Sequence, residues 1–226
     1  MSGTAFFDMD RTLTKSGTWS RYLVSVNKRR PLFYIRLPLL ALHALAYKLG
    51  FASRQSVKEH GLKTLKWAGR DHLESLAERF ADTEIRHGLR RQTHAVLNKH
   101  RQAGDRLVMV TAAADLVARP MAQKLGMDVV ISTELAWSDQ GHLTGKLVGG
   151  NCYGQSKLTR IHQADAKHQF SNPTIGYSDH VSDLPLLIWV DKGVAVNPSR
   201  ALARIADKAG LGIQNWDAET IDSETS

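Results

Sequence analysis

Residues 5–12, with the sequence AFFDMDRT, decide how the rest of the chain is interpreted. Three apolar residues lead directly into Asp8 and Asp10, which are separated by one residue, and the hydroxyl of Thr12 follows. A short apolar run of this kind predicts a buried strand with the carboxylates at its carboxyl end. Open parallel sheets bind their ligands at that end. Two carboxylates this close repel each other unless a cation or a proton lies between them, so the pattern indicates half of a site for a hard metal ion.

Length and charge limit the possible classes of protein. The 226 residues carry a formal net charge of +8, and such a chain can bury a substantial core. The basic balance favours an anionic partner, such as nucleic acid, a phospholipid surface or a phosphorylated substrate. Cys152 is the only cysteine, which excludes a disulfide within the chain and suits a reducing compartment. The first residues show no secretory signal, so we expect a cytoplasmic location.

From about residue 88 onward, predicted strands and helices alternate. We expect strands at 106–111, 128–132, 173–179 and 193–196, helices at 89–102, 115–124, 155–162, 182–189 and 199–208, and a hairpin joining 135–137 to 143–148. Strands that alternate with helices of about ten residues indicate βα units on a parallel sheet. The predicted fold is therefore α/β, with a three-layer Rossmann-like parallel sheet.

The segment between the first strand and residue 88 has a helical pattern instead. Helices are predicted to begin near Thr18, at Pro31, after Ser53 and near Asp71. We expect residues 14–87 to form an all-helical cap inserted after the first strand. Residues 1–13 and 88–226 would then form the α/β catalytic core.

Further polar residues lie where predicted strands end. Beyond the first strand these residues are Thr111 with Ala112, Lys157, Asp179 and Asp183. Carboxylates are ligands that Mg²⁺ prefers. A lysine and a hydroxyl, together with free backbone N–H groups, suit phosphate oxygens, and a carboxylate beside a metal can attack phosphorus.

In order and spacing, these segments resemble the four motifs of the haloacid dehalogenase (HAD) superfamily. The helical insert after the first strand is most similar to the phosphoserine-phosphatase-like subfamily IB. The resemblance extends from Ala5 to about Ala206, and its first and last motifs are the most specific. It implies a phosphatase that hydrolyses a phosphate monoester through an aspartyl-phosphate, with Mg²⁺ as cofactor.

The resemblance also implies a role for each catalytic position. Asp8 would be the nucleophile and a metal ligand. Asp10 would act as acid and then as base, and would contact the metal through its backbone carbonyl. Thr111 and the N–H of Ala112 would hold the phosphoryl group, and Lys157 would neutralise charge on the nucleophile and the phosphate.

The last motif implies the remaining metal ligands, and the chain departs from the family pattern at three places. Asp179 would bind Mg²⁺ directly, and Asp183 directly or through water. Arg11 stands where glycine is common, and His180 stands where a small residue is more usual. Residues 15–20 lack the acidic residue with which phosphoserine phosphatases hold the amino group of their substrate, which disfavours phosphoserine itself.

Residues 32–47 allow two interpretations. A helix of this length reaches roughly 24 Å, short of the ~30 Å needed to span a bilayer. It is either a core helix of the cap or a surface that lies on an anionic membrane through residues 28–48. In the second case the basic residues Lys28, Arg29, Arg30 and Lys48 would anchor it. Some relatives with a similar stretch act on phospholipid head-group phosphates such as phosphatidylglycerophosphate.

The substrate is accordingly either a small phosphorylated molecule or a lipid head-group phosphate. In the second case the enzyme would be peripheral at the inner face of the membrane. A basic nucleic-acid-binding module without catalysis is an alternative from a different class. The sequence has no helix-turn-helix signature, aromatic platform or zinc-ligand spacing, so no nucleic-acid partner is expected.

Overall fold

A computed structural model describes residues 2–51 and 53–219. Its strands form one sheet in the order β4-β3-β2-β1-β5-β6-β7. Neighbouring strands are parallel except in the antiparallel hairpin of β3 and β4. The strands are β1 (Thr4–Phe7), β2 (Arg106–Ala114), β3 (Val129–Trp137), β4 (Leu143–Val148), β5 (Thr174–Ser178), β6 (Lys192–Val196) and β7 (Gly212–Gln214). The α/β parallel sheet predicted from the sequence is therefore confirmed.

The central strand β1 is buried on both faces. Phe7 packs into the hydrophobic cluster on one face and Phe6 into the cluster on the other, because successive side chains of a strand point in opposite directions. Helices α5 (Thr93–Ala103) and α6 (Asp115–Lys124) contribute to the first cluster. Helices α7 (Gln155–His168) and α8 (Leu184–Trp189) contribute to the second, and α9 (Arg200–Ala206) contributes to a third, smaller cluster.

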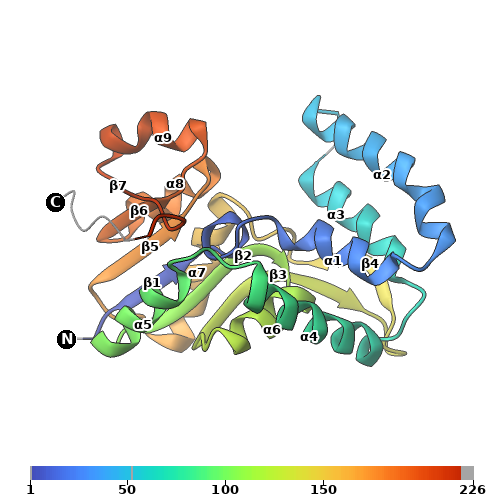
Figure 1. Ribbon diagram of the computed structural model, residues 1–226, viewed down its shortest axis with the longest axis horizontal. Coiled ribbons are helices and arrows are strands. Elements are labelled where there is room, and N and C mark those ends of the chain that lie inside the picture. The colour runs from blue at the N-terminus through green and yellow to red at the C-terminus, as the bar shows by residue number, and fades with distance from the viewer. Residues whose placement is uncertain (1, 52, 220–226) are drawn as a thin grey trace.

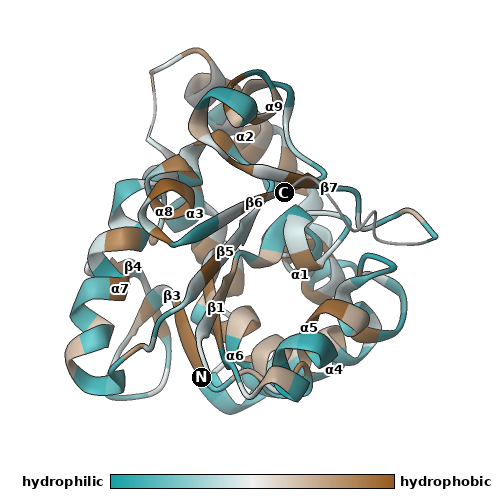
Figure 2. Ribbon diagram, turned by 90° about the vertical axis from the view of Figure 1, so that its left-hand side faces the viewer, coloured by the Kyte–Doolittle hydropathy of each residue, from teal (hydrophilic) through white to brown (hydrophobic). Residues whose placement is uncertain are grey.

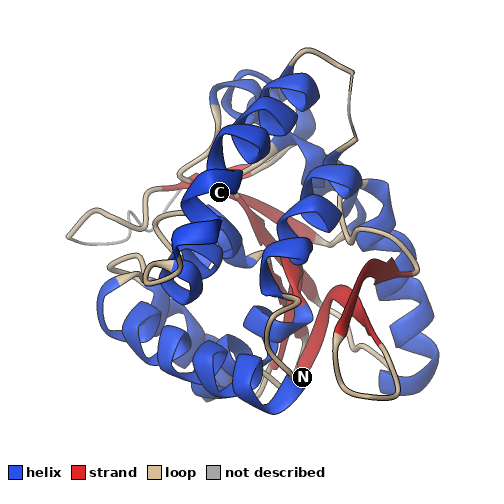
Figure 3. Cartoon of the chain, turned by 90° about the vertical axis from the view of Figure 1, so that its right-hand side faces the viewer, coloured by secondary structure: helices blue, strands red, loops and turns tan. Residues whose placement is uncertain are grey.

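These helices make the molecule a three-layer structure. Figure 3 shows the strands enclosed by helices on both sides. In Figure 2 the hydrophobic colour follows the central strands, whereas the outer helices carry more of the hydrophilic colour.

Four helices lie between β1 and α5. They are α1 (Thr18–Asn27), α2 (Pro31–Lys48), α3 (Arg54–Leu62) and α4 (Arg70–His87). The chain enters and leaves this insert through two segments that hydrogen-bond to each other, from Lys15 N to Gly88 O at 2.8 Å and from Arg90 N to Leu13 O at 2.9 Å. Helix α4 packs against α6, whereas α2 lies beside α3 at the outer edge of the molecule (Figure 1). The division into a cap of residues 14–87 and a core stays a prediction.

Helix α2 is mostly exposed, so the interpretation of residues 32–47 as a core helix is wrong. Leu32 and Ile35 are 71% and 73% exposed, and Leu42 is 61% exposed, whereas Phe33 is buried. Among the helices of the described residues, none has both the length and the apolar character needed to cross a bilayer.

Helix α5 and strand β7 are two of the elements that differ from the sequence prediction, each for a physical reason. Helix α5 begins at Thr93 rather than at residue 89, because Arg90 and Gln92 donate their backbone N–H groups to Leu13 and Trp216 instead of following a helical path. Strand β7 was not predicted from the sequence. Its three residues acquire strand geometry by pairing with β6, a contact that short local patterns do not reveal.

Candidate active site

Lys157 lies between two aspartates at the carboxyl end of β1. Its Nζ is 2.6 Å from Asp8 Oδ1 and 2.6 Å from Asp183 Oδ2, and all three side chains are buried. Asp8 directly follows β1, and Lys157 lies in the first turn of α7. Ser178, the last residue of β5, donates its hydroxyl to Asp183 Oδ2 at 2.7 Å and so fixes that carboxylate. Two carboxylates and one ammonium group thus form a buried hydrogen-bonded chain.

The charges of this hydrogen-bonded group of side chains favour the binding of an additional cation. Burial raises the pKa of Asp8 to about 7, Lys157 opposes that rise, and Asp183 and Asp179 add to it. Burial and the neighbouring Asp183 raise the pKa of Asp179 to about 6. Burial acts to lower the pKa of Lys157, but Asp183 and Asp8 hold it above its ordinary value, so the lysine is charged. Three carboxylates around one ammonium group leave an excess of negative charge, which a metal ion would relieve.

Asp10 is held by the beginning of the insert. Its Oδ1 accepts hydrogen bonds from both the backbone N and the hydroxyl of Thr18, each at 2.8 Å. Thr18 is the first residue of α1, so the carboxylate lies at the partly positive end of that helix. Burial nevertheless raises the pKa of Asp10, against the effect of the two bonds from Thr18. A carboxyl group with a raised pKa retains a proton closer to neutral pH, as a general acid requires.

Arg11 adopts a left-handed backbone conformation, with φ of 65° and ψ of −1°. Glycine adopts this conformation with the least strain, which explains why glycine is common at this position in the family. Arg90 stabilises the turn, since its Nε and Nη2 donate to the carbonyl of Arg11 at 2.8 and 2.5 Å. Arg90 also pairs with Asp217 near the end of the described chain.

Thr12 connects the first predicted motif to the last. Its hydroxyl donates to Asp8 Oδ2 at 3.2 Å and accepts from the backbone N of Asp179 at 3.1 Å. One hydroxyl can donate one hydrogen bond and accept others, so Thr12 fixes the separation of the two aspartates without competing with either.

The end of β2, from Thr111 onward, is held from two sides. Thr111 is fully buried, and its hydroxyl oxygen accepts from the backbone N of Ala113 at 3.0 Å. The carbonyl of Ala112 accepts from Nζ of Lys58, which comes from α3 of the insert. Lys58 also donates to Asn151 Oδ1 at 2.6 Å. An inserted helix therefore touches the segment predicted to hold the phosphoryl group.

One cavity of about 290 Å³ collects the predicted site residues. The residues that border it include Asp8, Asp10, Thr111, Ala112, Lys157, Asp179 and Asp183. His180 also borders it and pairs through Nδ1 with the hydroxyl of Ser182 at 2.9 Å. The individual roles assigned to these residues stay predictions.

Four residues that contact the site had no predicted role there: Thr12, Thr18, Ser178 and Lys58. Thr12 and Thr18 lie close to the carboxylates in sequence. For Thr12, a hydroxyl directly beside the acidic motif could have indicated a role in the site. Thr18 is eight residues from Asp10, and only the path of the intervening turn brings them together. Lys58 meets its partner 54 residues away, so no local pattern could reveal that contact.

The donor chemistry of this site fits Mg²⁺. Within residues 2–51 and 53–219, no group of three or more His, Cys, Asp or Glu side chains could hold a metal by itself. Mg²⁺ does not require such a cluster, because it is usually bound by one or two carboxylates together with waters and phosphate oxygens. Asp179 lies close enough to Asp8 to raise the pKa of Asp8. The two carboxylates provide this kind of donor set.

Comparison with known proteins agrees with this geometry. The family model for haloacid dehalogenase-like hydrolases matches residues 5–187, and the chain belongs to that family. The chain is 25% identical to the histidinol-phosphatase of Neisseria meningitidis serogroup C (strain 8013), an alignment that covers 96% of this chain and 100% of the relative. It is 27% identical to phosphoserine phosphatase SerB1 of Mycobacterium tuberculosis, over 96% of this chain and 71% of the relative.

A solved structure extends the likeness to the whole fold. A protein of unknown function from Bordetella pertussis Tohama I superposes with a TM-score of 0.85 at 27% identity, covering 94% of this chain and 98% of the other. The chain is thus a hydrolase of the HAD family, of the phosphoserine-phosphatase-like type and with the activity class of a phosphatase.

Proposed function

We propose that this chain hydrolyses a phosphate monoester with Mg²⁺, through a phosphoryl intermediate on Asp8. The observation that carries the proposal is the pairing of buried Asp8 with Lys157 at the end of the central strand. Lys157 removes part of the charge that would otherwise repel a phosphate, while an oxygen of Asp8 attacks phosphorus. Phosphoryl transfer depends mainly on such positioning and charge neutralisation.

The proposed reaction has two steps. In the first, a carboxylate oxygen of Asp8 bonds to phosphorus, the bond from phosphorus to the ester oxygen breaks, and Asp10 gives its proton to the departing alkoxide. In the second, water attacks the aspartyl-phosphate while Asp10 takes a proton from that water. Phosphate leaves and the carboxylate of Asp8 is regenerated. Two steps with a covalent intermediate replace one very slow hydrolysis.

Other residues would hold the phosphoryl group and the metal. The hydroxyl of Thr111 and the N–H of Ala112 would bind phosphate oxygens together with Lys157. Mg²⁺, when bound, supplies positive charge that stabilises the transferring phosphoryl group. The ligands would be Asp8, Asp179, the backbone carbonyl of Asp10, and Asp183 directly or through water. Residues 14–87 would act as a cap that excludes bulk water and selects the substrate.

The test compares three variants on p-nitrophenyl phosphate with Mg²⁺. Asp8→Asn should lose hydrolysis, whereas Asp139→Asn, a change in the exposed loop between β3 and β4, should behave as wild type. Asp10→Asn should still accept the phosphoryl group from this activated ester but should release it slowly. A phosphorylated chain that is cleaved by hydroxylamine should therefore accumulate. Wild-type turnover by Asp8→Asn would rule out the mechanism.

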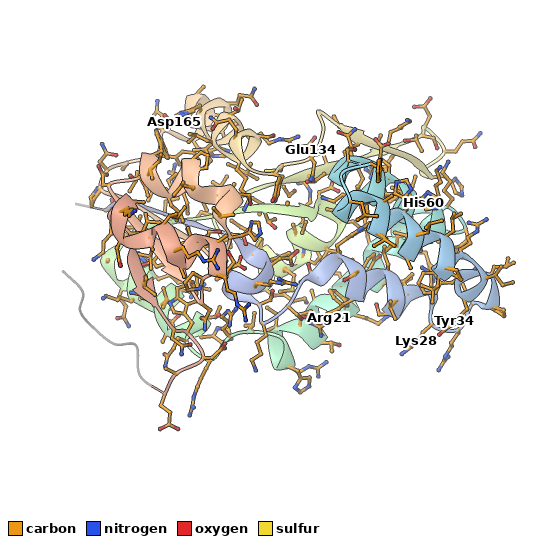
Figure 4. The ribbon with its side chains drawn as sticks, turned by 90° about the horizontal axis from the view of Figure 1, so that it is seen from above. Arg21, Lys28, Tyr34, His60, Glu134 and Asp165 are labelled. Carbon is orange, nitrogen blue, oxygen red and sulfur yellow. The ribbon has the colours of Figure 1, made fainter. Side chains whose placement is uncertain are left out.

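A second candidate substrate is a lipid head-group phosphate, and the exposed face of α2 favours it. Leu32 and Ile35 in the first turns of α2 are 71% and 73% exposed, and Lys28 and Arg29, which precede the helix, are also exposed. Figure 4 shows Lys28 close to Tyr34 at the edge of the molecule, where the Tyr34 hydroxyl donates to the Lys28 carbonyl at 2.9 Å. Apolar side chains flanked by cations are typical of surfaces that bind anionic bilayers.

Sedimentation with vesicles tests this candidate. The protein should sediment with vesicles that contain phosphatidylglycerol and much less with phosphatidylcholine alone. Changing Lys28 and Arg29 to Gln, or Ile35 to Ser, should weaken sedimentation. Arg30 is left unchanged because its guanidinium stacks on the ring of Trp67 at 3.2 Å. Protein that stays in the supernatant with both kinds of vesicle would leave the small soluble ester as the substrate.

A further inference from the structure

We propose that the apolar cavity between α1, α2 and α3 binds a hydrocarbon portion of the alcohol that carries the phosphate. The inference rests on the proposed phosphatase function and names the chemical class of the substrate: a phosphate monoester whose alcohol becomes apolar beyond the ester oxygen. A lipid and a soluble aliphatic phosphate share this chemistry.

The cavity has a volume of about 470 Å³, and its walls are mainly apolar. They include Trp19 and Leu23 of α1, Phe33, Leu37 and Leu40 of α2, and Val57 of α3. Pockets that hold small ligands have volumes of this order and are lined mainly by apolar side chains. The inserted helices thus provide a site of the size and polarity that a hydrocarbon group requires.

The position of the cavity relative to Asp10 determines which part of a substrate it would receive. Asp10 and Ala112 border both this cavity and the cavity that contains Asp8 and Lys157. If Asp10 protonates the leaving oxygen, that oxygen must lie within hydrogen-bonding distance of its carboxyl group. With phosphorus held at Asp8, the alcohol then extends past Asp10 toward the inserted helices.

Among the described residues, the charged side chains that line this cavity belong to Asp10, which also borders the catalytic cavity, and to Lys58, which contacts Ala112 at the boundary of the two cavities. Lys58 and Asn151 hydrogen-bond to each other there, and Lys58 also binds the carbonyl of Ala112. Asp10 is the only carboxylate among the described residues that line the cavity. An ammonium group such as that of phosphoserine would therefore find no separate anionic partner, whereas a hydrocarbon chain would replace water along the apolar walls.

The cavity also reaches the surface of the insert. Val24 and Leu37 border it and are 50% and 36% exposed. An elongated hydrocarbon can therefore enter from the exposed side of α1 and α2 while its phosphate faces Asp8. This route does not depend on whether the molecule comes from solution or from a lipid layer.

A series of n-alkyl phosphates from ethyl to octyl, kept below their micelle-forming concentrations, tests the inference in the presence of Mg²⁺. The value of kcat/KM should rise about fourfold for each methylene group buried, and phosphoserine should be a poor substrate. A flat dependence on chain length would overturn the inference. If the dependence is flat but Asp8→Asn no longer hydrolyses ethyl phosphate, the proposed phosphatase function still holds. If Asp8→Asn still hydrolyses ethyl phosphate, the proposed function itself is refuted.

A pair of variants on the same helix locates the effect. Ala41 borders the cavity, whereas its neighbour Leu42 is 61% exposed. Ala41→Trp should reduce the ratio of kcat/KM for octyl over ethyl phosphate at least tenfold, and Leu42→Trp should keep the wild-type ratio. Equal ratios in both variants would overturn the assignment of the site.

Direct binding gives a readout that does not depend on turnover. Octylphosphonate, which has no ester bond to hydrolyse, should bind the wild-type protein at least tenfold more tightly than ethylphosphonate does in calorimetry, and Ala41→Trp should remove the difference. Equal affinities in the wild-type protein would contradict the inference. Comparing a monomeric short-chain phosphatidic acid with a long-chain one in vesicles then distinguishes a substrate taken from solution from one taken from a lipid layer. Faster hydrolysis of either phosphatidic acid than of ethyl phosphate supports the hydrocarbon site.

Discussion

Replacing Lys157 by Met should destabilise the protein strongly and in a way that depends on pH. The substitution removes the ammonium group that lies 2.6 Å from Asp8 and 2.6 Å from Asp183. Both carboxylates are buried, and removing one partner of a buried ion pair typically costs about 3–5 kcal/mol. We expect a loss of that size in the free energy of unfolding at pH 8, together with loss of phosphatase activity.

The sign of the pH dependence follows from the raised pKa of Asp8. Its pKa is about 7 in the folded chain against an ordinary value of 3.8, so between these values the folded state holds more protons than the unfolded state. Stability from this group therefore falls as the pH rises through that range. Lys157 lowers the pKa of Asp8, so Lys157→Met raises it further. The destabilisation should be largest at pH 8 and should shrink toward pH 5.

The assay is urea unfolding without Mg²⁺, at pH 8 and at pH 5, for a double-mutant cycle. Asp8→Asn removes one of the buried charges, so the double variant with Lys157→Met should lose less stability than the two single changes added together. Lys167→Met is the matched control, since Lys167 is an exposed residue of the same helix and its change should stay within about 0.5 kcal/mol. A loss below about 1 kcal/mol at pH 8, or an equal loss at both pH values, would refute the electrostatic reasoning.

Two further predictions concern other hydrogen bonds. Thr18→Val removes one of the two hydrogen bonds to Asp10, so kcat/KM should fall about 10–100-fold and the limb of the pH–rate profile that reports Asp10 should move to higher pH. Thr18→Ser should retain both hydrogen bonds. Identical pH–rate profiles for the two variants would contradict this prediction. Burial acts to raise the pKa of Asp105, but hydrogen bonds from His100 and Gly3 hold it below its ordinary value. Such a carboxylate stabilises the fold above its ordinary pKa of 3.8 and loses this effect as the pH falls through its lowered pKa. Asp105→Ala should therefore cost about 2 kcal/mol at pH 7 in urea unfolding, and the cost should decrease as the pH is lowered below 3.8. A cost that is constant with pH would contradict this.

The sequence was most informative where chemistry and local pattern coincide. Asp8 could be located because an apolar run predicts the strand before it, and Asp179 for the same reason at the end of β5. Parallel strands bring such ends together at one edge of the sheet, so adjacency in space follows from the predicted topology. No backbone conformation was predicted for Arg11, although glycine is common at its position in the family.

Contacts between distant segments could not be predicted. The bond from Lys58 to the carbonyl of Ala112 depends on how α3 lies against the core. The exposure of α2 could not be deduced either. The apolar pattern of a helix does not show whether another helix of the same chain covers it. Nothing in the 18 residues of α2 records that α3 packs on only part of its circumference.

The two aspartates of the first motif depend on different parts of the molecule. Asp8 is hydrogen-bonded to Lys157 of α7 and to Thr12 of the same turn. Asp10, two residues later, is bonded to Thr18, the first residue of the inserted helices. A displacement of α1 would therefore move the partner of Asp10 while leaving the partners of Asp8 in place. Since α1 also forms a wall of the apolar cavity, an alcohol bound there contacts the same helix that orients the proposed acid and base. Binding of the alcohol and protonation of its oxygen are in this way coupled through one structural element.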